Sequence, residues 1–385
     1  MLVAGMLILP VAIVAAPMIP TRDDQVLEIL PETIADVRAR ELRTMRNALA
    51  AAPSNLALAA PLAAEYIEIG RITGDPRYSG YAQSALGPWW NQEKPPSEVL
   101  ILRAQLRQRA HEFGPAMRDL QQVLAVNPRD PRARLQRATI RQVTGDYAGA
   151  LTDCEALAKV ATTLLATHCR AMVMSVTGDL DAAYTLLESA VTAADGLAPV
   201  TAAWILTSLA ELAERSGRAE LSDKYFGAAL SLTPDDQYLL MAYADFLLAH
   251  DRADEVIHLV APHLRVDGLL LRYALALRTS EASTADEVVV QLRARFAANA
   301  ARQESAHKRE EARFVLELEG DAERALVLAR ENWAVQKEPA DLRILVACAR
   351  RAGSTEALAL ARDWIAKTGL EDRTLGALSS PVAAR

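Results

Sequence analysis

The chain has 385 residues and a net charge of −7, and 51% of its residues are hydrophobic and 24% charged. This is the composition of a folded globular protein and excludes a wholly disordered chain. It has no run of five or more Lys and Arg residues, so the basic patch typical of nucleic-acid-binding proteins is missing, and its three cysteines are too few for a disulfide framework.

The composition also favours helices. Alanine, the best helix former, occurs 74 times, whereas Gly occurs only 17 times and Pro only 18 times. A single compact core stops growing at roughly 250–300 residues, so the chain forms either two domains or an elongated fold that needs no single core.

Residues 1–20 form the first element in chain order. They carry no charge and contain a strongly apolar run, and Arg22, Asp23 and Asp24 follow directly. This pattern predicts a secretory signal peptide or an N-terminal membrane anchor, and therefore export to the periplasm and possible membrane association through residues 1–20. The alternative is a buried N-terminal helix in a cytoplasmic protein. Residues 21–54 are predicted to form a helical cap, with a helix over about 32–51.

Short polar turns then recur along the chain, each followed by an apolar helical segment. The mean spacing is about 35 residues, which predicts about nine helical hairpins over residues 55–368 and a frayed tail over 369–385. The turns are centred on Gly74, His111, Gly145, Gly178, Gly217, Asp251, Ser283, Gly320 and Ala352–Gly353.

Small residues recur at fixed distances from these turns. Seven residues before six successive turns stand Ala104, Ala138, Ala171, Ala210, Ala244 and Ala276. Five residues after the turns stand Ala116, Ala150, Ala183, Ser222, Val256, Val288 and Ala325. Two antiparallel helices cross closely only where both side chains are small, so these positions mark the contact inside each hairpin.

With these residues the chain resembles the tetratricopeptide repeat (TPR) family. The stretch from Gly217 to Pro234, with Phe226 and Ala229, follows the family pattern, and so does Gly145-Asp146-Tyr147. The resemblance implies an all-α, right-handed solenoid of antiparallel helical hairpins. Exported bacterial members of the family tend to be envelope scaffolds. The resemblance therefore implies that the protein is a non-enzymatic scaffold for protein–protein interactions and needs no cofactor.

In this family the first helix of each hairpin, helix A, lines the concave surface. Counting back from the turns places aromatic, Met and acidic side chains on that surface, a mixture that suits a partner protein or peptide segment with a hydrophobic anchor and basic groups. The predicted partner-binding residues are Trp204, Glu211, Glu214, Tyr238, Met241, Asp245, His307, Glu310, Phe314 and Glu317.

No phosphate-binding glycine loop, HExxH, CxxC or GxSxG motif occurs, so the sequence gives no support to an enzyme. One alternative uses His250, Asp254 and His258, whose i, i+4, i+8 spacing is compatible with a metal site on one helix face. Cys154 and Cys169 fall in consecutive helices. They form either a disulfide or, as we favour from the sequence, two separate buried side chains.

Overall fold

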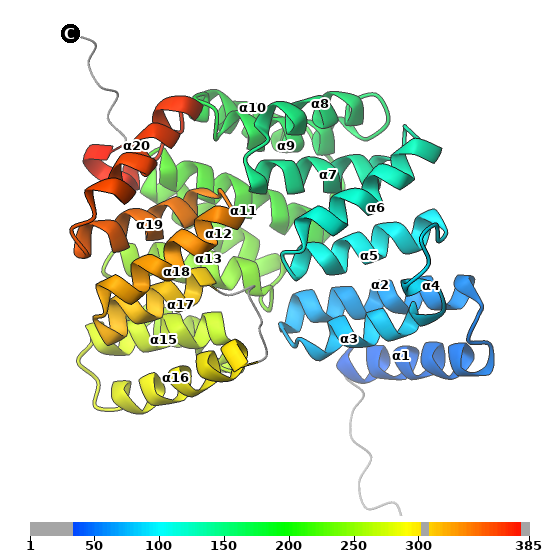
Figure 1. The fold of residues 1–385 in the computed structure, drawn as a ribbon, viewed down its shortest axis with the longest axis horizontal. Coiled ribbons are helices and arrows are strands. Elements are labelled where there is room, and N and C mark those ends of the chain that lie inside the picture. Colours follow the sequence, from blue (N-terminus) through cyan, green and yellow to red (C-terminus); the bar gives the residue numbers. More distant parts are fainter. Residues whose placement is uncertain (1–33, 302–307, 379–385) are drawn as a thin grey trace, which may run out of the picture.

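The structure is a computed structural model and describes residues 34–301 and 308–378. All regular elements in these ranges are helices, and consecutive helices run antiparallel in hairpins that stack side by side (Figure 1). The fold is an all-α helical solenoid, as the repeat spacing predicts. Within the described ranges, no helix is long and apolar enough to cross a membrane. Residues 1–20 lie outside them.

In the part of the chain that the structure describes, one helix precedes the repeats and nine hairpins follow. The opening helix is α1 (Ile34–Ala51), within two residues of the predicted bounds, and the short helix α4 (Gly87–Trp90) separates the first two hairpins. The A helices are α2 (Leu56–Thr73), α5 (Ser97–Arg109), α7 (Pro131–Thr144), α9 (Thr163–Met174), α11 (Pro199–Arg215), α13 (Gln237–Ala249), α15 (Asp267–Thr279), α17 (Lys308–Phe314, continued by a π-helical turn, Val315–Glu319) and α19 (Pro339–Arg351).

The second helix of each hairpin, helix B, packs against its A helix. The B helices are α3 (Arg77–Ala85), α6 (Phe113–Val126), α8 (Tyr147–Leu157), α10 (Leu180–Thr192), α12 (Ala219–Leu232), α14 (Ala253–Val260), α16 (Ala285–Ala301), α18 (Ala322–Val335) and α20 (Thr355–Thr368). Two short 3₁₀ segments complete the described chain, at Ala261–His263 and Arg373–Leu378.

A residue with positive φ ends the A helix of every hairpin. Glycine adopts this backbone conformation at Gly74, Gly145, Gly178, Gly217, Gly320 and Gly353, and His111, Asp251 and Glu281 adopt it at the other three turns. Eight of these nine positions belong to the predicted turns. In the seventh hairpin the positive φ falls at Glu281 and α16 begins at Ala285, so the turn around Ser283 is longer than elsewhere.

The small residues predicted at the contact inside each hairpin lie there. Five of the six alanines that precede the turns have no exposed surface, and Ala138 is 3% exposed. Six of the seven residues that follow the turns also have no exposed surface, among them Ser222 and Val256. Val288 is the exception because the longer turn shifts α16, and its neighbour Val289 is buried instead.

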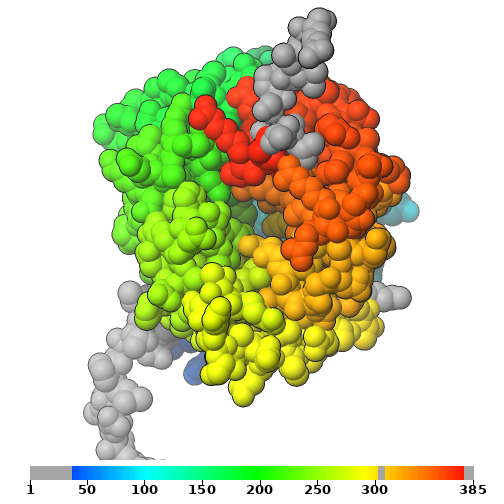
Figure 2. Space-filling view, turned by 90° about the vertical axis from the view of Figure 1, so that its left-hand side faces the viewer, coloured from blue at the N-terminus to red at the C-terminus, as the bar shows by residue number. Residues whose placement is uncertain are grey.

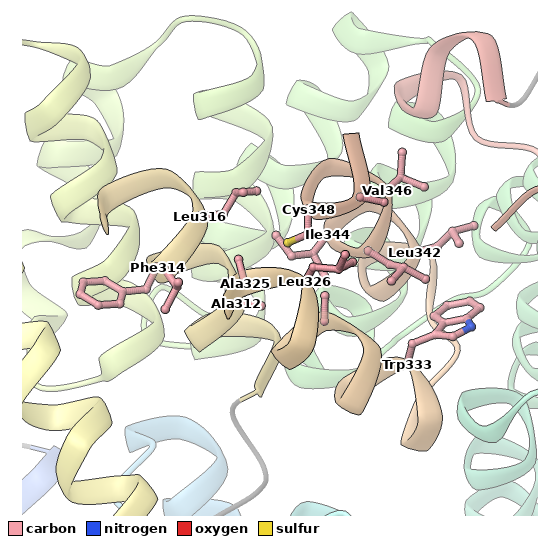
Figure 3. Packing of buried hydrophobic residues seen from close by; sticks show 14 of the residues in the cluster. Ala312, Phe314, Leu316, Ala325, Leu326, Trp333, Leu342, Ile344, Val346 and Cys348 are labelled. Atoms are coloured by element: carbon pink, nitrogen blue, oxygen red, sulfur yellow. The ribbon is translucent and has the colours of Figure 1, made fainter. Parts of the chain in front are cut away.

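Buried clusters follow one another along the array, as expected for a solenoid in which each hairpin packs on its neighbours. The largest joins α15 to α20, and Figure 3 shows its central part, with Phe314, Trp333 and Cys348. Cys154 and Cys169 form a disulfide between α8 and α9, with their Cα atoms 5.5 Å apart. Our preference for two separate side chains was therefore wrong, because the short connection between α8 and α9 brings both Cα atoms within bridging distance.

The solenoid also folds back on itself. The turns of the first, third and fifth hairpins touch residues far along the chain: Gly74 lies against Gln237, Gly145 against Trp364, and Gly217 against Arg373. Two hydrogen bonds join the same regions, because the Lys337 N–H donates to the Val143 carbonyl at 2.7 Å and the Tyr147 hydroxyl donates to the Lys337 carbonyl at 3.3 Å. Figure 2 shows the second half of the chain curving around one face of the molecule.

The segment after α20 is packed and not frayed, which corrects the expectation for residues 369–376. Leu370 and Leu375 are 4% and 3% exposed, and the Asp372 carboxylate accepts from Arg343 at 2.8 Å. The Glu371 carbonyl accepts from Arg215 at 3.0 Å. The helical pattern does end at Thr368, but two buried leucines and these polar contacts hold the following turn against α11 and α19.

Candidate functional site

Five of the predicted partner-binding residues line one cavity of about 140 Å³ on the inner side of the solenoid. They are Glu211 and Glu214 on α11 and Tyr238, Met241 and Asp245 on α13. Other residues of its wall come from α7, α8, α9, α15, α17 and α19. The inner surface of the middle repeats is therefore partly covered by the last repeats of the same chain.

Trp204 lies two helical turns before Glu211 on α11 and is not among the residues that line the cavity. Its side chain is 40% exposed, and one face of the indole lies against His168 of α9, with 3.8 Å between the ring centroids. His168 is buried and hydrogen-bonds to the Ser208 hydroxyl at 2.9 Å. Burial lowers the pKa of His168 to about 3, so the imidazole is neutral and Trp204 rests on an uncharged ring.

Tyr238 and Glu211 are hydrogen-bonded to each other across two A helices. The Tyr238 hydroxyl donates to the Glu211 carboxylate at 2.6 Å. Tyr238 is 53% exposed, and part of its side chain lines the cavity. The same surroundings raise the pKa of Glu211 to about 7 through burial, an effect that the bond from Tyr238 opposes.

The acidic side chains of the cavity have basic partners that the sequence interpretation did not anticipate. Arg313 of α17 and Arg272 of α15 both contact Asp245, Arg272 at 2.6 Å. Burial alone would raise the pKa of Asp245, but the two guanidinium groups outweigh it and lower the pKa to about 2. Arg343 lies 3.5 Å from Glu214. The expected surplus of negative charge on this surface is therefore largely compensated from within the chain.

Helix α17 shows a second difference. Phe314 was predicted to face the concave surface, but it is 1% exposed and packs on Phe296 in the core, so this prediction is wrong. The π-helical turn Val315–Glu319 adds one residue before Gly320. The inward positions of α17, which were assigned by their distance from Gly320, are therefore shifted by one residue. The corrected inward positions are Arg309 and Arg313, which line the cavity and contact Asp245, respectively.

Of the other residues predicted on α17, Glu310 is 9% exposed and bonds to Arg272 at 2.6 Å, so it is not a free surface group. Glu317 is exposed and accepts from Arg313 at 3.0 Å. His307 lies outside the described residues. No observation tests the partner binding assigned to Trp204, Tyr238 and the other remaining residues, so it stays a prediction.

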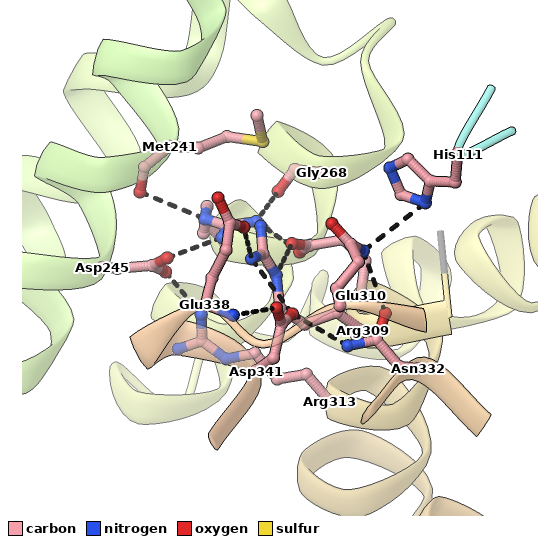
Figure 4. Close-up of polar contacts among 12 residues, drawn as sticks. His111, Met241, Asp245, Gly268, Arg309, Glu310, Arg313, Asn332, Glu338 and Asp341 are labelled. Carbon is pink, nitrogen blue, oxygen red and sulfur yellow. Dashed lines mark hydrogen bonds and ion pairs between the residues drawn. The ribbon is translucent and has the colours of Figure 1, made fainter. Parts of the chain in front are cut away.

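A buried polar network borders the cavity and joins four A helices and α18 (Figure 4). Arg272 contacts Asp245 and Glu310, and Arg309 lies 3.3 Å from Glu338 and 3.4 Å from Asp341. Asn332 of α18 donates to Asp341 at 2.8 Å. Because each charge has an opposite partner, the network fixes α17 and α19 against α13 and α15 without a large net charge.

The residues of the metal hypothesis do not come together. His250 ends α13 and directs its Nδ1 to the carbonyl of Phe246, 2.8 Å away. Asp254 and His258 follow on α14, after the turn at Asp251, so the three residues do not share one helix. Among the residues that the structure describes, no group of three or more His, Cys, Asp or Glu side chains is placed to hold a metal ion.

Sequence reasoning missed the arginines of the cavity, chiefly Arg215, Arg309 and Arg343. Arg309 and Arg313 did carry a signal, since their i, i+4 spacing places both on one helix face. Arg215 lies two residues before the predicted turn at Gly217, and nothing in its local sequence indicates a buried contact.

Comparison with known proteins gives no family assignment. No protein-family model matches the chain, and no curated protein matches it by sequence. Solved structures that resemble it include a thermophilic TPR protein from Thermus thermophilus (22% identity, 49% of this chain and 97% of that one, TM-score 0.39). A human IFIT1 dimer with PPP-AAAA is 13% identical over 86% of this chain and 84% of that one, with a TM-score of 0.45. Yeast Tom70 is 13% identical over 89% and 90%, with a TM-score of 0.37. At these identities and TM-scores the similarities assign neither a family nor a function to the chain.

Proposed function

We propose that the protein is a non-enzymatic scaffold of the cell envelope that binds another protein or a peptide segment next to Trp204 and Tyr238. The observation that carries this proposal is the exposure of two large aromatic side chains, 40% and 53%, on the neighbouring A helices α11 and α13. Aromatic side chains on a rigid support are the commonest anchors of protein interfaces. Val200, one turn before Trp204, is 50% exposed and extends the same apolar surface.

The interface we propose is less acidic than the sequence alone indicates. Arg343, Arg272 and Arg313 already contact Glu214 and Asp245, so a partner gains little by supplying basic groups there. We therefore expect the partner to contribute mainly a hydrophobic side chain that packs on the open face of Trp204.

Two features support placement outside the cytoplasm. The apolar residues 1–20 have the pattern of an export signal or anchor. The disulfide between Cys154 and Cys169 suits an oxidising compartment, because cytosolic thiols are kept reduced. Cell fractionation tests this part of the proposal, and recovery of the full-length protein in the soluble cytoplasm would favour the cytoplasmic adaptor.

The binding surface is tested with Trp204→Ala in the full chain. Proteins crosslinked to the wild type in its native host are identified, and their capture by the variant is compared at equal folded protein. We expect partner affinity to fall by about 2 kcal/mol, roughly 30-fold, with a small change in melting temperature. Val126→Ala is the matched control, because Val126 is 80% exposed on α6, far from Trp204 in the repeat order. Core-like destabilisation of Trp204→Ala with unchanged capture would reject the surface.

A further inference from the structure

The cavity contains a buried cation that no carboxylate of the described residues contacts. Arg215, at the end of α11, lines the cavity and is 4% exposed. Its guanidinium group donates to the Ser175 hydroxyl at 3.3 Å, to the Ser175 carbonyl and to the Glu371 carbonyl at 3.0 Å. All these acceptors are uncharged, and among the described residues no carboxylate lies within salt-bridge distance of Arg215.

Arg215 also has unused donors. A guanidinium group has five N–H donors, and the Nε of Arg215 has no hydrogen-bond partner among the described residues. Burial lowers the pKa of Arg215 to about 10, although the charges of Asp372 and Glu211, which lie beyond salt-bridge distance, act in the opposite direction. A buried charge of this kind is stabilised by an anion.

The other charges of the cavity do not supply that anion. Asp245 and Glu214 contact arginines, and Glu338 lies 3.3 Å from Arg309. Glu211 precedes Arg215 by four residues on α11, but it accepts from the Tyr238 hydroxyl, and its raised pKa leaves it partly protonated near neutral pH. Lys337 is a second cation of the cavity and donates to the Trp333 carbonyl. Among the described residues, no carboxylate lies within salt-bridge distance of Lys337.

Part of the wall is apolar. Met172 of α9, Leu212 of α11 and Met241 of α13 line it, together with Ala242 and Ala340. The volume of about 140 Å³ is close to that of an engineered protein cavity of about 150 Å³ that binds benzene. The space therefore suits a molecule with a small apolar body next to a charged group.

We propose that this cavity binds a small organic acid whose carboxylate pairs with Arg215 and whose apolar body contacts Met172, Leu212 and Met241. The proposal assigns a second site to the protein, inside the solenoid, and does not depend on partner binding at Trp204. A carboxylate there supplies the counter-ion that the chain itself does not provide and fills the space left between α11, α13 and α19.

Benzoate is the probe, because it joins a carboxylate to a ring of the right size. Binding of benzoate, benzamide and inorganic phosphate to the full-length protein is measured by calorimetry and by the shift in melting temperature. We expect benzoate to bind at least tenfold more tightly than benzamide, which has the same shape without the charge, and than phosphate, which has the charge without the apolar body.

Two variants and a control locate the site. Arg215→Met should weaken benzoate binding at least tenfold, and Ala242→Phe should abolish it by filling the cavity while leaving Arg215 and its contacts in place. Arg132→Met, which removes an exposed arginine paired with Glu98, should bind benzoate like the wild type. If Arg215→Met does not fold, Ala242→Phe and the comparison with benzamide decide.

Several results would overturn the proposal. Absence of benzoate binding at millimolar concentration, or binding that Ala242→Phe leaves unchanged, would reject the cavity as the site. Equal binding of benzamide and benzoate would remove the role of Arg215. Phosphate binding as tight as that of benzoate would overturn the assignment to an organic acid.

Discussion

The backbones of Gly178 and Gly369 are in direct contact, although 190 residues separate them in the sequence. A Cβ atom on Gly369 would lie 3.2 Å from the Cα of Gly178, and both residues have positive φ. This contact places the end of α20 on the turn between α9 and α10, next to the Ser175 and Glu371 carbonyls that Arg215 holds.

The Gly178–Gly369 contact predicts a large effect of Gly369→Ala. Alanine costs about 1 kcal/mol at a positive φ, and overpacking adds about 1–3 kcal/mol. Gly320→Ala is the control, because Gly320 has a similar φ of 76° but open space where its Cβ would lie. Urea unfolding should show a loss of about 1 kcal/mol for Gly320→Ala and of at least 2 kcal/mol for Gly369→Ala. Equal losses would mean that the two glycines are not in contact.

Asp245→Asn should destabilise the fold more than loss of a surface ion pair. It removes the carboxylate that Arg272 and Arg313 share, and Arg272 is almost fully buried. We expect a loss of about 2–3 kcal/mol in the free energy of unfolding, because a buried charge left without its partner is costly. Asp286→Asn, which breaks an exposed pair with Arg278, should cost less than about 1 kcal/mol. Similar losses for both variants would show that Asp245 is not part of a buried network.

Glu211 predicts a pH dependence of stability. Its pKa is about 7 in the folded protein, against roughly 4.3 for an unfolded glutamate. The folded state therefore holds the proton more tightly than the unfolded state. The contribution of Glu211 to the free energy of unfolding is complete below about pH 4.3 and is lost as the pH rises through 7. Glu214 and Glu338, whose pKa values burial also raises, act in the same direction.

Glu211→Gln separates this contribution from the others, because glutamine is uncharged at every pH. In denaturant titrations, the wild type should lose stability between pH 5 and pH 8, and this loss should be smaller in the variant. Glu255→Gln, at an exposed site on α14, is the control and should not reduce the pH dependence in this range. A wild-type stability difference that Glu211→Gln leaves unchanged would contradict the raised pKa.

The disulfide predicts sensitivity to reduction. It closes a loop of 15 residues, for which chain-entropy estimates give about 3 kcal/mol. Reduction, or replacement of both Cys154 and Cys169 by serine, should lower the urea midpoint accordingly. Cys348 is buried and unpaired, and burial raises its pKa to about 12, so it should react with thiol reagents only after unfolding. Three reactive thiols in the unfolded, unreduced protein would show that the disulfide is absent.

The sequence was sufficient for the repeat architecture because the features that define a hairpin are local. Gly145 and Gly217 mark turns that need positive φ, and Ala210 marks a close helix crossing. A further periodic signal was present but not used. Asp119 and Asp153 stand 34 residues apart, and each accepts from two or more arginines of the preceding A helix.

The side chains that line the concave surface, and their partners, were harder to predict from the sequence. The π-helical turn after Phe314 has no clear sequence pattern, yet its extra residue replaces Glu310 and Phe314 by Arg309 and Arg313 on the inner face. Asp245 meets Arg313, 68 residues further along the chain, only because the solenoid curves back on itself. Such curvature depends on small rotations accumulated over many repeats, which no single motif indicates.

The contacts between the hairpin turns and the C-terminal repeats change how the array should unfold. In an open repeat array, stability is close to a sum of nearest-neighbour terms, and terminal repeats fray independently. Here Gly145 lies against Trp364, and Val143 is bonded to Lys337, so the third hairpin loses packing when the last ones detach. The molecule should therefore unfold as one cooperative unit, and it should fold slowly, because these contacts join segments far apart in the sequence.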